Sequence, residues 1–399
     1  MTMATNERHG LHTQRGVEVL GISGRTLGSY PYLTQSFGIV KAATARANGE
    51  ASIIDSVRAQ ALVDAARELA NGSLDPALFP ADLLGGGGSI AIHMNVNEVL
   101  SAQANQALGR TSGAADAVDP KRHASASQST ADVCHTASRL AVLATAEFMI
   151  ANLNRAIAGL IAVAEQFSTI PTLSRTCLRD GVVAPLSTIF SGSAEALIRR
   201  RDGLVETLKH LDTVVLGTTV IGLGTGAPTA YRDIVVELLA EESKRVVRLH
   251  PNPPSALQHG DDLVAVSGAI AQIGHPLLKL ASDLRLLGAG PVGGFGEIVL
   301  PHVIDGSAFF SDKSNPVVPE TIMHACLQVQ GLNHTVQLSA ERAELYLQVF
   351  DGLVVVNVLD ALRLMTEALD RLDRFVLTDL RANAQRCADL SASATGPAT

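Results

Sequence analysis

The sequence predicts an all-α protein whose centre is a bundle of very long helices. Residues 132–170 contain no proline and a single glycine, Gly159. Within this stretch, apolar residues recur at spacings of three, four and seven, which places them on one stripe of a helix: Leu140, Leu143, Ile150, Leu153, Ile157, Leu160 and Ala164. A helix of about 40 residues is roughly 60 Å long and must pack along its length against other helices. We therefore expect a bundle, and an oligomer whose core continues across subunits.

A second apolar pattern and the weakness of strand signals support the same fold class. The pattern runs from Ser339 to about Leu390, and Gly352 with the β-branched run Val354–Val356 predicts a bend within it. Residues 214–224 contain β-branched residues but lie among glycines, which disfavours a strand. Shorter helices are predicted near residues 186–213, 229–247, 261–285 and 318–332.

The first third of the chain predicts smaller helices that precede the bundle. Residues 1–16 are polar and resemble a frayed tail, and residues 17–37 suggest irregular structure. Helical periodicity begins near Phe37 and recurs over residues 53–69. The turn-rich residues 109–122 predict a domain junction.

Composition excludes several classes of partner. The 399 residues carry a net charge of −8, and the one dense basic run, Arg199–Arg201, suits an exposed helix face, so we expect no nucleic-acid partner. The four cysteines form no CxxC pair, which favours a reducing compartment without a disulfide framework or a zinc site. The N-terminus has no apolar signal core and no uninterrupted apolar run reaches membrane-spanning length, so we expect a cytoplasmic protein without a membrane partner.

Two further motifs have ordinary structural explanations. The run Gly288–Gly293 matches GxGxxG, but a helical pattern precedes it where a dinucleotide site requires a strand, so we expect no nucleotide cofactor. His93 follows a glycine run and could reach a site, although a lone histidine is more often structural. The histidines and cysteines have no convincing ligand spacing, and we expect no metal.

Residues 303–320, VIDGSAFFSDKSNPVVPE, form a polar loop in a chain that is otherwise rich in alanine and leucine. Gly306 allows a backbone turn, Ser307 can act as a nucleophile or base, and Lys313 supplies a cation. The amide of Asn315 can hold a carboxylate. The loop could grip an anion while it removes a proton, and the alternative is a solvated surface loop.

Residues 123–132, HASASQSTAD, place hydroxyls and a carboxylate just before the long helix. Ser127, Ser129, Thr130 and Asp132 suit a helix N-cap. The same groups could bind an anion, because free amides meet hydroxyls at the positive end of a helix. The two interpretations are compatible.

Six segments in order resemble the aspartase/fumarase superfamily, in its aspartate ammonia-lyase and class II fumarase branch. The loop GSAFFSDKSNPVVPE is similar to the family's GSSxMPxKxNPxxxE. Five further segments resemble its motifs and extend the similarity from about residue 17 to 388: GGGGSIAIHMNVNEVL, HASASQSTADVCHTASR, RTCLRDGVVAPL, TVVLGTTVIGLGTGAP and SDLRLLGAGPVGGFGEI.

The resemblance implies a homotetramer with an all-α fold, in which each active site is assembled from segments of three subunits. It divides the chain into an N-terminal helical domain (1–122), a central long-helix bundle forming the tetramer core (123–378), and a remnant of a truncated C-terminal domain with a disordered tail (379–399). The implied reaction is reversible elimination from a succinate skeleton to give fumarate, with no cofactor.

The resemblance also assigns site residues. Ser307 is implied as the base that removes the β-proton, and Lys313 and Asn315 as the groups that hold a carboxylate. Gly306 and Glu320 are implied as supporting residues. The remaining implied substrate-binding residues come from three other segments: Ser89, His93, Ser129, Thr130, Thr176 and Cys177.

Departures from the family pattern indicate a changed substrate. Ala308 replaces a second serine, Ala131 replaces an asparagine, and Cys177 replaces a histidine that would pair with Glu320. His93 replaces another asparagine, and the family threonine falls on Ser89 or Ile90. We expect a carbon–nitrogen lyase of secondary metabolism that acts on a dicarboxylate such as aspartate or an N-substituted or nitro-succinate. The alternatives are a fumarase-type hydratase and a catalytically silent structural homologue.

Overall fold

A computed structural model of the chain describes residues 9–305, 309–310 and 313–394. It divides into two compact units, each discontinuous in sequence. Unit 1 comprises Met1–Thr145, Thr207–Val266 and His334–Leu359, and unit 2 comprises Ala146–Glu206, Ser267–Asn333 and Asp360–Thr399. The predicted all-α class is confirmed. The predicted domain division at residues 122 and 378 stays a prediction.

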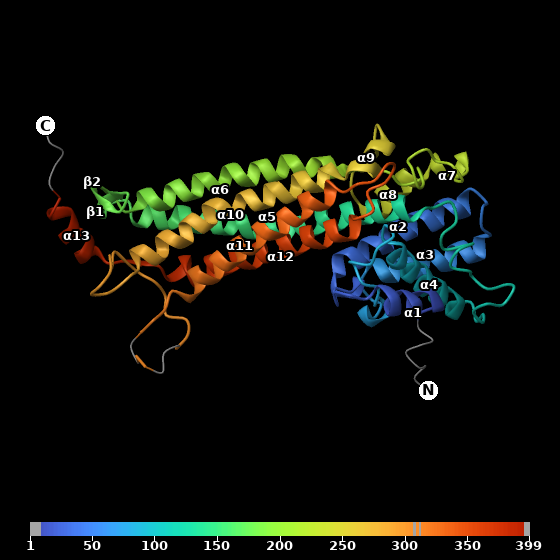
Figure 1. The fold of residues 1–399 in the computed structure, drawn as a ribbon, viewed down its shortest axis with the longest axis horizontal. Helices are drawn as coiled ribbons and strands as arrows, with labels where there is room; N and C mark the ends of the chain where they lie inside the picture. The colour runs from blue at the N-terminus through green and yellow to red at the C-terminus, as the bar shows by residue number, and fades with distance from the viewer. Residues whose placement is uncertain (1–8, 306–308, 311–312, 395–399) are drawn as a thin grey trace. The chain divides into compact units, whose positions relative to one another are not determined.

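Four helices form the N-terminal part of unit 1: α1 (Leu11–Leu20), α2 (Pro31–Glu50), α3 (Ser56–Ala70) and α4 (Ile90–Ala107). Helices α2 and α3 pack side by side, and α4 packs on α3 and α1 (Figure 1). Gly38 permits the close approach of α2 to α3, because a Cβ there would lie 2.3 Å from the backbone nitrogen of Ala70. Asp55 caps α3 by accepting a hydrogen bond from the Arg58 backbone N–H.

Helix α1 corrects the expectation that residues 1–16 are a frayed tail. The carboxylate of Glu98, buried on α4, accepts hydrogen bonds from the backbone N–H of His12 at 3.0 Å and of Thr13 at 2.8 Å. The Thr13 hydroxyl donates to it at 2.6 Å. A carboxylate at a helix N-terminus satisfies unpaired donors and suits the helix dipole. Helix α1 therefore forms because of a residue about 85 positions away.

The rest of unit 1 contains short helices and the beginnings or ends of longer ones. The short elements are α7 (Thr229–Arg232), α8 (Val235–Ser243), α9 (Pro253–His259), the 3-10 turns at Leu27–Ser29, Pro76–Leu78 and Lys209–Asp212, and a parallel pair, β3 (Thr213–Val214) with β4 (Arg248–Leu249). Helix α8 packs on α2, where Glu242 binds both Arg46 at 2.8 Å and Arg67 at 2.7 Å.

Unit 2 is built from five long helices that run side by side (Figure 1). They are the corresponding parts of α5 (Thr130–Gln166), α6 (Ser187–Leu208), α10 (Asp261–Leu287), α11 (Val317–Ala340) and α12 (Asp351–Phe375). Polar contacts join neighbours along the bundle. Arg201 binds Asn154 at 3.1 Å, the Gln330 amide donates to the carbonyl of Ala271 at 2.8 Å, and Arg155 pairs with Asp370 at 3.1 Å.

Small sheets complete unit 2. The antiparallel hairpin of β1 (Pro171–Thr176) and β2 (Arg179–Pro185) was missed by the sequence analysis. A second antiparallel pair joins β5 (Ile298–Val299) to β6 (Arg381–Ala382), followed by α13 (Ala384–Ala392). A 3-10 turn covers Leu377–Asp379.

The two long apolar stretches of the sequence correspond to different numbers of helices. The helix expected over residues 132–170 is α5, from Thr130 to Gln166. The apolar stretch from Ser339 to about Leu390 is three helices rather than one bent helix, because turns separate α11 from α12 and α12 from α13. The predicted disordered tail reaches into residues 395–399, which lie outside the described residues.

Two helices, α5 and α10, are long and apolar enough to cross a membrane by length and composition alone. This is weak support for a membrane span, because the core helix of a helical bundle passes the same test. Helix α5 carries the apolar stripe that the sequence predicted, with Leu140, Leu153 and Leu160 buried.

Candidate active site

The N-terminus of α5 is held by a reciprocal cap in unit 1. The Ser129 hydroxyl accepts from the Ala131 N–H at 3.0 Å, and the Asp132 carboxylate accepts from the Ser129 N–H at 2.9 Å. The second oxygen of Asp132 accepts from the N–H groups of Gly217 and Thr219, both at 3.1 Å. Burial raises the pKa of Asp132 to about 6, while these backbone donors oppose the increase. The predicted capping role is present, and it also anchors the loop after β3.

A buried polar cluster is in contact with Thr130, the first residue of α5. His93 on α4 places Nδ1 3.0 Å from the Thr130 hydroxyl oxygen and Nε2 2.7 Å from the Lys41 ammonium nitrogen on α2. Lys41 and His93 are 2% and 3% exposed, whereas Thr130 is half-buried. Burial lowers the pKa of Lys41 to about 7, and burial together with the Lys41 charge lowers the pKa of His93 well below its ordinary value. His93 is therefore a neutral hydrogen-bonding residue.

Lys41 is the residue of this cluster that the sequence analysis missed. It lies in the run IVKAATARA, where apolar or small residues surround it on the helix. A lysine whose helical neighbours are predicted to be core residues needs buried acceptors. That signal was available in the sequence, but the identity of the acceptors was not.

Ser89 occupies a different setting from Thr130. It is the N-cap residue of α4 with a left-handed backbone (φ 65°) and is buried. Its hydroxyl donates to the Asp351 carboxylate at 2.9 Å, and burial raises the pKa of Asp351 to about 6. The hydroxyl proton of Ser89 is thus already bound by a carboxylate of the same unit.

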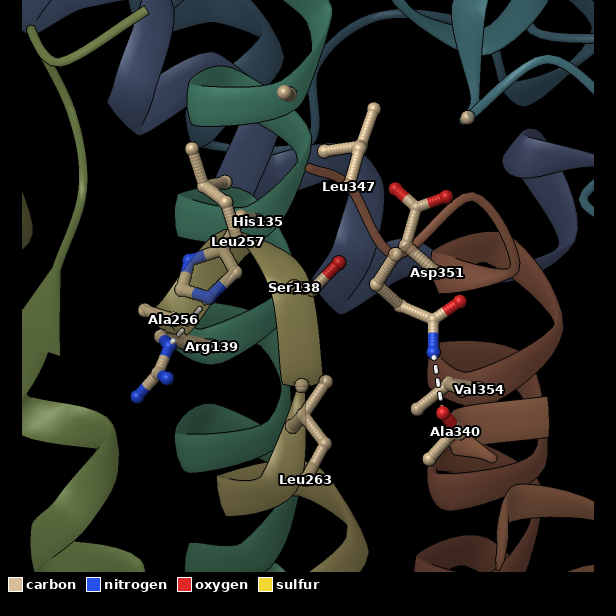
Figure 2. Close-up of a pocket in the computed structure, with 14 residues that line it drawn as sticks. His135, Ser138, Arg139, Ala256, Leu257, Leu263, Ala340, Leu347, Asp351 and Val354 are labelled. Atoms are coloured by element: carbon tan, nitrogen blue, oxygen red, sulfur yellow. Dashed lines mark hydrogen bonds between the residues drawn. The ribbon is translucent and has the colours of Figure 1, made fainter. Parts of the chain in front are cut away.

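A small cavity of about 40 Å³ lies beside Asp351 and Ala131 in unit 1. Figure 2 shows His135 and Arg139 on one side of it and Leu347 and Asp351 on the other. Arg139 donates to Asp262 at 2.5 Å and to the carbonyl of His210 at 2.9 Å, so its charge is paired. Ala131, which follows the first residue of α5, contributes its methyl group to the lining.

In unit 2, Thr176 and Cys177 lie at the tip of the β1–β2 hairpin. Thr176 pairs with Arg179, and the two residues between them, Cys177 and Leu178, have φ values of 51° and 57°. Two positive φ angles are typical of a two-residue hairpin turn that usually requires Asn or Gly. Cys177 is exposed there.

The base of this hairpin is anchored by a buried carboxylate. Glu297, which is 0% exposed, accepts hydrogen bonds from Thr172 and from Arg175, the latter at 2.6 Å. The Arg175 guanidinium also lies 4.2 Å from the ring centroid of Phe295. Arg175 therefore holds the hairpin to Glu297 and Phe295.

The loop residues predicted to hold a carboxylate are exposed in unit 2. Lys313 places its ammonium 5.8 Å from the Phe310 ring centroid. The backbone carbonyl of Asn315 accepts from the Val317 N–H at 2.8 Å, at the start of α11. Glu320 pairs with Arg285 at 3.3 Å. Gly306 and Ser307 lie outside the described residues, so their roles stay predictions.

The predicted site residues thus fall into two sets. Unit 1 contains Ser89, His93, Ser129 and Thr130, of which His93 and Thr130 are in direct contact. Unit 2 contains Thr176, Cys177, Lys313, Asn315 and Glu320. The first set offers a hydroxyl at a helix N-terminus, which suits a carboxylate. The second set offers a cation and an amide.

The chain is similar to known lyases over most of its length. A protein family described as Lyase matches residues 1–331. Aspartate ammonia-lyase of Pseudomonas aeruginosa is 32% identical over 392 residues, covering 98% of this chain and 82% of the relative. Class II fumarate hydratase of Thermosynechococcus vestitus is 32% identical over 348 residues, covering 87% of this chain and 74% of the relative. The structure of fumarate lyase:delta crystallin from Brucella melitensis bound to cobalt matches with a TM-score of 0.93 and 33% identity, covering 97% of this chain and 84% of that one.

Proposed function

The chain belongs to this lyase family, and from that membership we propose that it catalyses the reversible anti-elimination of an amine-type leaving group from a succinate-like substrate, giving fumarate. The observation that carries the proposal is the half-buried Thr130 hydroxyl at the N-terminus of α5, held by neutral His93. It provides a place for a carboxylate oxygen. The similarity to aspartate ammonia-lyases favours nitrogen as the leaving atom.

The chemistry assigns a role to each predicted residue. A proton next to a carboxylate is weakly acidic, so its removal requires donors that stabilise the doubly negative intermediate. Lys313 and Asn315 would hold one carboxylate, and Ser129 and Thr130 the other. Ser307 would remove the proton, which requires an ionised serine stabilised by nearby positive charge or amide dipoles.

The substrate we propose is an N-substituted or nitro-succinate rather than aspartate. Ala131 and Cys177 lack the amide and imidazole of the family pattern, and the Ser89 hydroxyl donates to Asp351. Each lost hydrogen bond to a charged substrate costs about 1.5–3 kcal/mol. The cavity next to Ala131 supplies room for a group on the substrate nitrogen.

A panel of nucleophiles tests this function. The purified chain is mixed with fumarate and, separately, ammonia, methylamine, hydroxylamine, nitrite or water, and the loss of fumarate absorbance is followed. We expect addition of a substituted nitrogen nucleophile to be faster than addition of ammonia. Loss of a general base lowers rates by about 10²–10⁴-fold, so Ser307→Ala should abolish turnover. Ser314→Ala, in the same loop and in contact with His302, is the matched control.

The panel also decides between the alternatives. Similarity to a class II fumarate hydratase favours a hydratase as the second candidate, and rapid addition of water alone would establish it. Absence of addition by every nucleophile would favour a catalytically silent homologue. Turnover that survives Ser307→Ala would exclude Ser307 as the base. Assembly as a homotetramer, a cytoplasmic location and a role in secondary metabolism belong to the same proposal.

A further inference from the structure

In the buried cluster that contacts Thr130, formed by Lys41, His93 and Gln128, each hydrogen-bond donor and acceptor can be assigned. Gln128 donates from its amide nitrogen to the carbonyls of Ala124 at 3.2 Å and Ala126 at 3.0 Å. These two acceptors set the orientation of the amide, so its oxygen faces Lys41, at 2.6 Å. The Ala124 carbonyl also faces the Lys41 nitrogen, at 3.1 Å. Two of the three neighbours of Lys41 can therefore only accept.

With Lys41 protonated, one tautomer of His93 satisfies the cluster. The ammonium has three hydrogens, and it meets the Ala124 carbonyl, the Gln128 oxygen and Nε2 of His93. Nε2 must then be the unprotonated nitrogen. A neutral imidazole carries its hydrogen on the other nitrogen, so Nδ1–H donates to the Thr130 hydroxyl oxygen at 3.0 Å. The hydroxyl hydrogen of Thr130 points away from His93 and is available to an acceptor outside the cluster.

With Lys41 neutral, the pattern reverses. The amine has two hydrogens, which the Ala124 carbonyl and the Gln128 oxygen take, and its lone pair faces His93. His93 then donates from Nε2–H, and its Nδ1 accepts the hydroxyl hydrogen of Thr130. The outward side of the Thr130 hydroxyl offers only lone pairs, which repel a carboxylate.

We propose that Lys41 and His93 are positioning residues that form a relay, in which the proton on Lys41 decides whether Thr130 donates to or accepts from the substrate. The proposal rests on the proposed function only in placing a substrate carboxylate at Thr130. The relay itself is a property of the buried cluster, and its tautomer can be measured without any turnover.

The groups around Lys41 place the loss of its proton within an experimentally accessible pH range. The titratable groups that act on Lys41 are His93 from α4 and Asp132 and Cys134 from α5, while residues 124–128 contribute only carbonyls, hydroxyls and an amide. Burial lowers the pKa of Lys41 to about 7, and Cys134 and Asp132 oppose the decrease. As pH rises through this value, Lys41 loses its proton and Thr130 becomes an acceptor. Carboxylate binding at Thr130 therefore weakens as pH rises.

Two substitutions of His93 separate its hydrogen bond with Thr130 from its hydrogen bond with Lys41. Asn places an N–H where Nδ1 lies, so His93→Asn retains the donor to Thr130 and loses the link to Lys41. Gln reaches the position of Nε2, so His93→Gln retains the link to Lys41 and loses the donor to Thr130. We expect His93→Gln to raise KM about 10-fold, as for one charge-assisted hydrogen bond, with a smaller change in kcat. His93→Asn should lose the rise in KM above about pH 7, because its donor to Thr130 no longer depends on the proton of Lys41.

Histidine-selective ¹⁵N NMR of the wild-type protein measures the tautomer of His93 without depending on activity. The His93 resonances are assigned by their absence in the two variants. We expect Nδ1 to be protonated at about pH 6 and Nε2 at about pH 8.5. A His93 tautomer that is unchanged across this range would overturn the relay even if the enzyme is active. A tautomer switch in a protein that acts on no succinate would keep the relay and overturn the proposed function instead.

Discussion

The two sets of predicted site residues differ in how completely the chain itself surrounds them. In unit 1, Lys41 and His93 are buried, and the hydrogen bonds around them orient Thr130. In unit 2, Cys177 and Lys313 are exposed. At the base of the hairpin, the Glu297 carboxylate that pairs with Arg175 is buried. One set is pre-organised by its own unit, whereas the other presents functional groups at the surface of its unit.

The difference shows that the cost of ordering side chains on substrate binding differs between the two sets. A buried network holds its donors in place before substrate arrives, so little ordering remains to be done on binding. Exposed side chains on a hairpin tip or loop must be ordered when they bind. This division agrees with the proposed homotetramer, in which the exposed groups of one subunit would be covered by another.

The largest expected effect is recovery of activity in mixed oligomers. Ser307→Ala and Thr130→Val should each be inactive or nearly so. If the two sets meet across subunits, some sites in a mixed oligomer contain neither substitution. Co-expression with two affinity tags, tandem purification and the fumarate assay should reveal activity well above that of either variant alone. A verified mixed oligomer without recovery would show that each chain builds its own site.

The next effect concerns the buried base of the hairpin. Arg175→Met leaves Glu297 in a buried position without its cation, and breaking such a pair costs about 3–5 kcal/mol. Urea unfolding should therefore show a lower free energy of unfolding by about that amount. Arg199→Ala removes an exposed pair with Glu195, whose side chains are 72% and 64% exposed, and should change stability little. Equal effects of the two substitutions would contradict the structural role assigned to Arg175.

A smaller effect is the pH dependence of stability that Lys41 produces. In the unfolded chain this lysine keeps its proton up to its ordinary pKa of 10.5, whereas the folded protein loses it at about 7. Between these values the unfolded state binds the additional proton, so the free energy of unfolding rises with pH. Relative to Lys41→Met, the wild type should gain about 1.4 kcal/mol per pH unit between about pH 7 and 10. Parallel pH profiles of the two proteins, measured by urea unfolding, would exclude a neutral Lys41.

Local patterns in the sequence were sufficient for the long helices and for the segments that carry the chemistry. The absence of proline and the spacing of Leu140, Leu153 and Leu160 predicted α5, because helical periodicity involves residues only a turn or two apart. The cap formed by Ser129 and Asp132 was predicted for the same reason. The resemblance to a lyase family was also readable from short motifs.

The contacts that give these motifs their properties required the tertiary structure. Lys41 and His93 are 52 residues apart, His93 and Thr130 are 37 apart, and Ser89 and Asp351 are 262 apart. No local period relates such positions. Burial lowers the pKa of Lys41, and burial together with the Lys41 charge lowers the pKa of His93. The β1–β2 hairpin likewise arose from pairing rather than from strand propensity. The sequence therefore named Thr130 as a binding group, and only the packing of α2, α4 and α5 decided which way its hydroxyl faces.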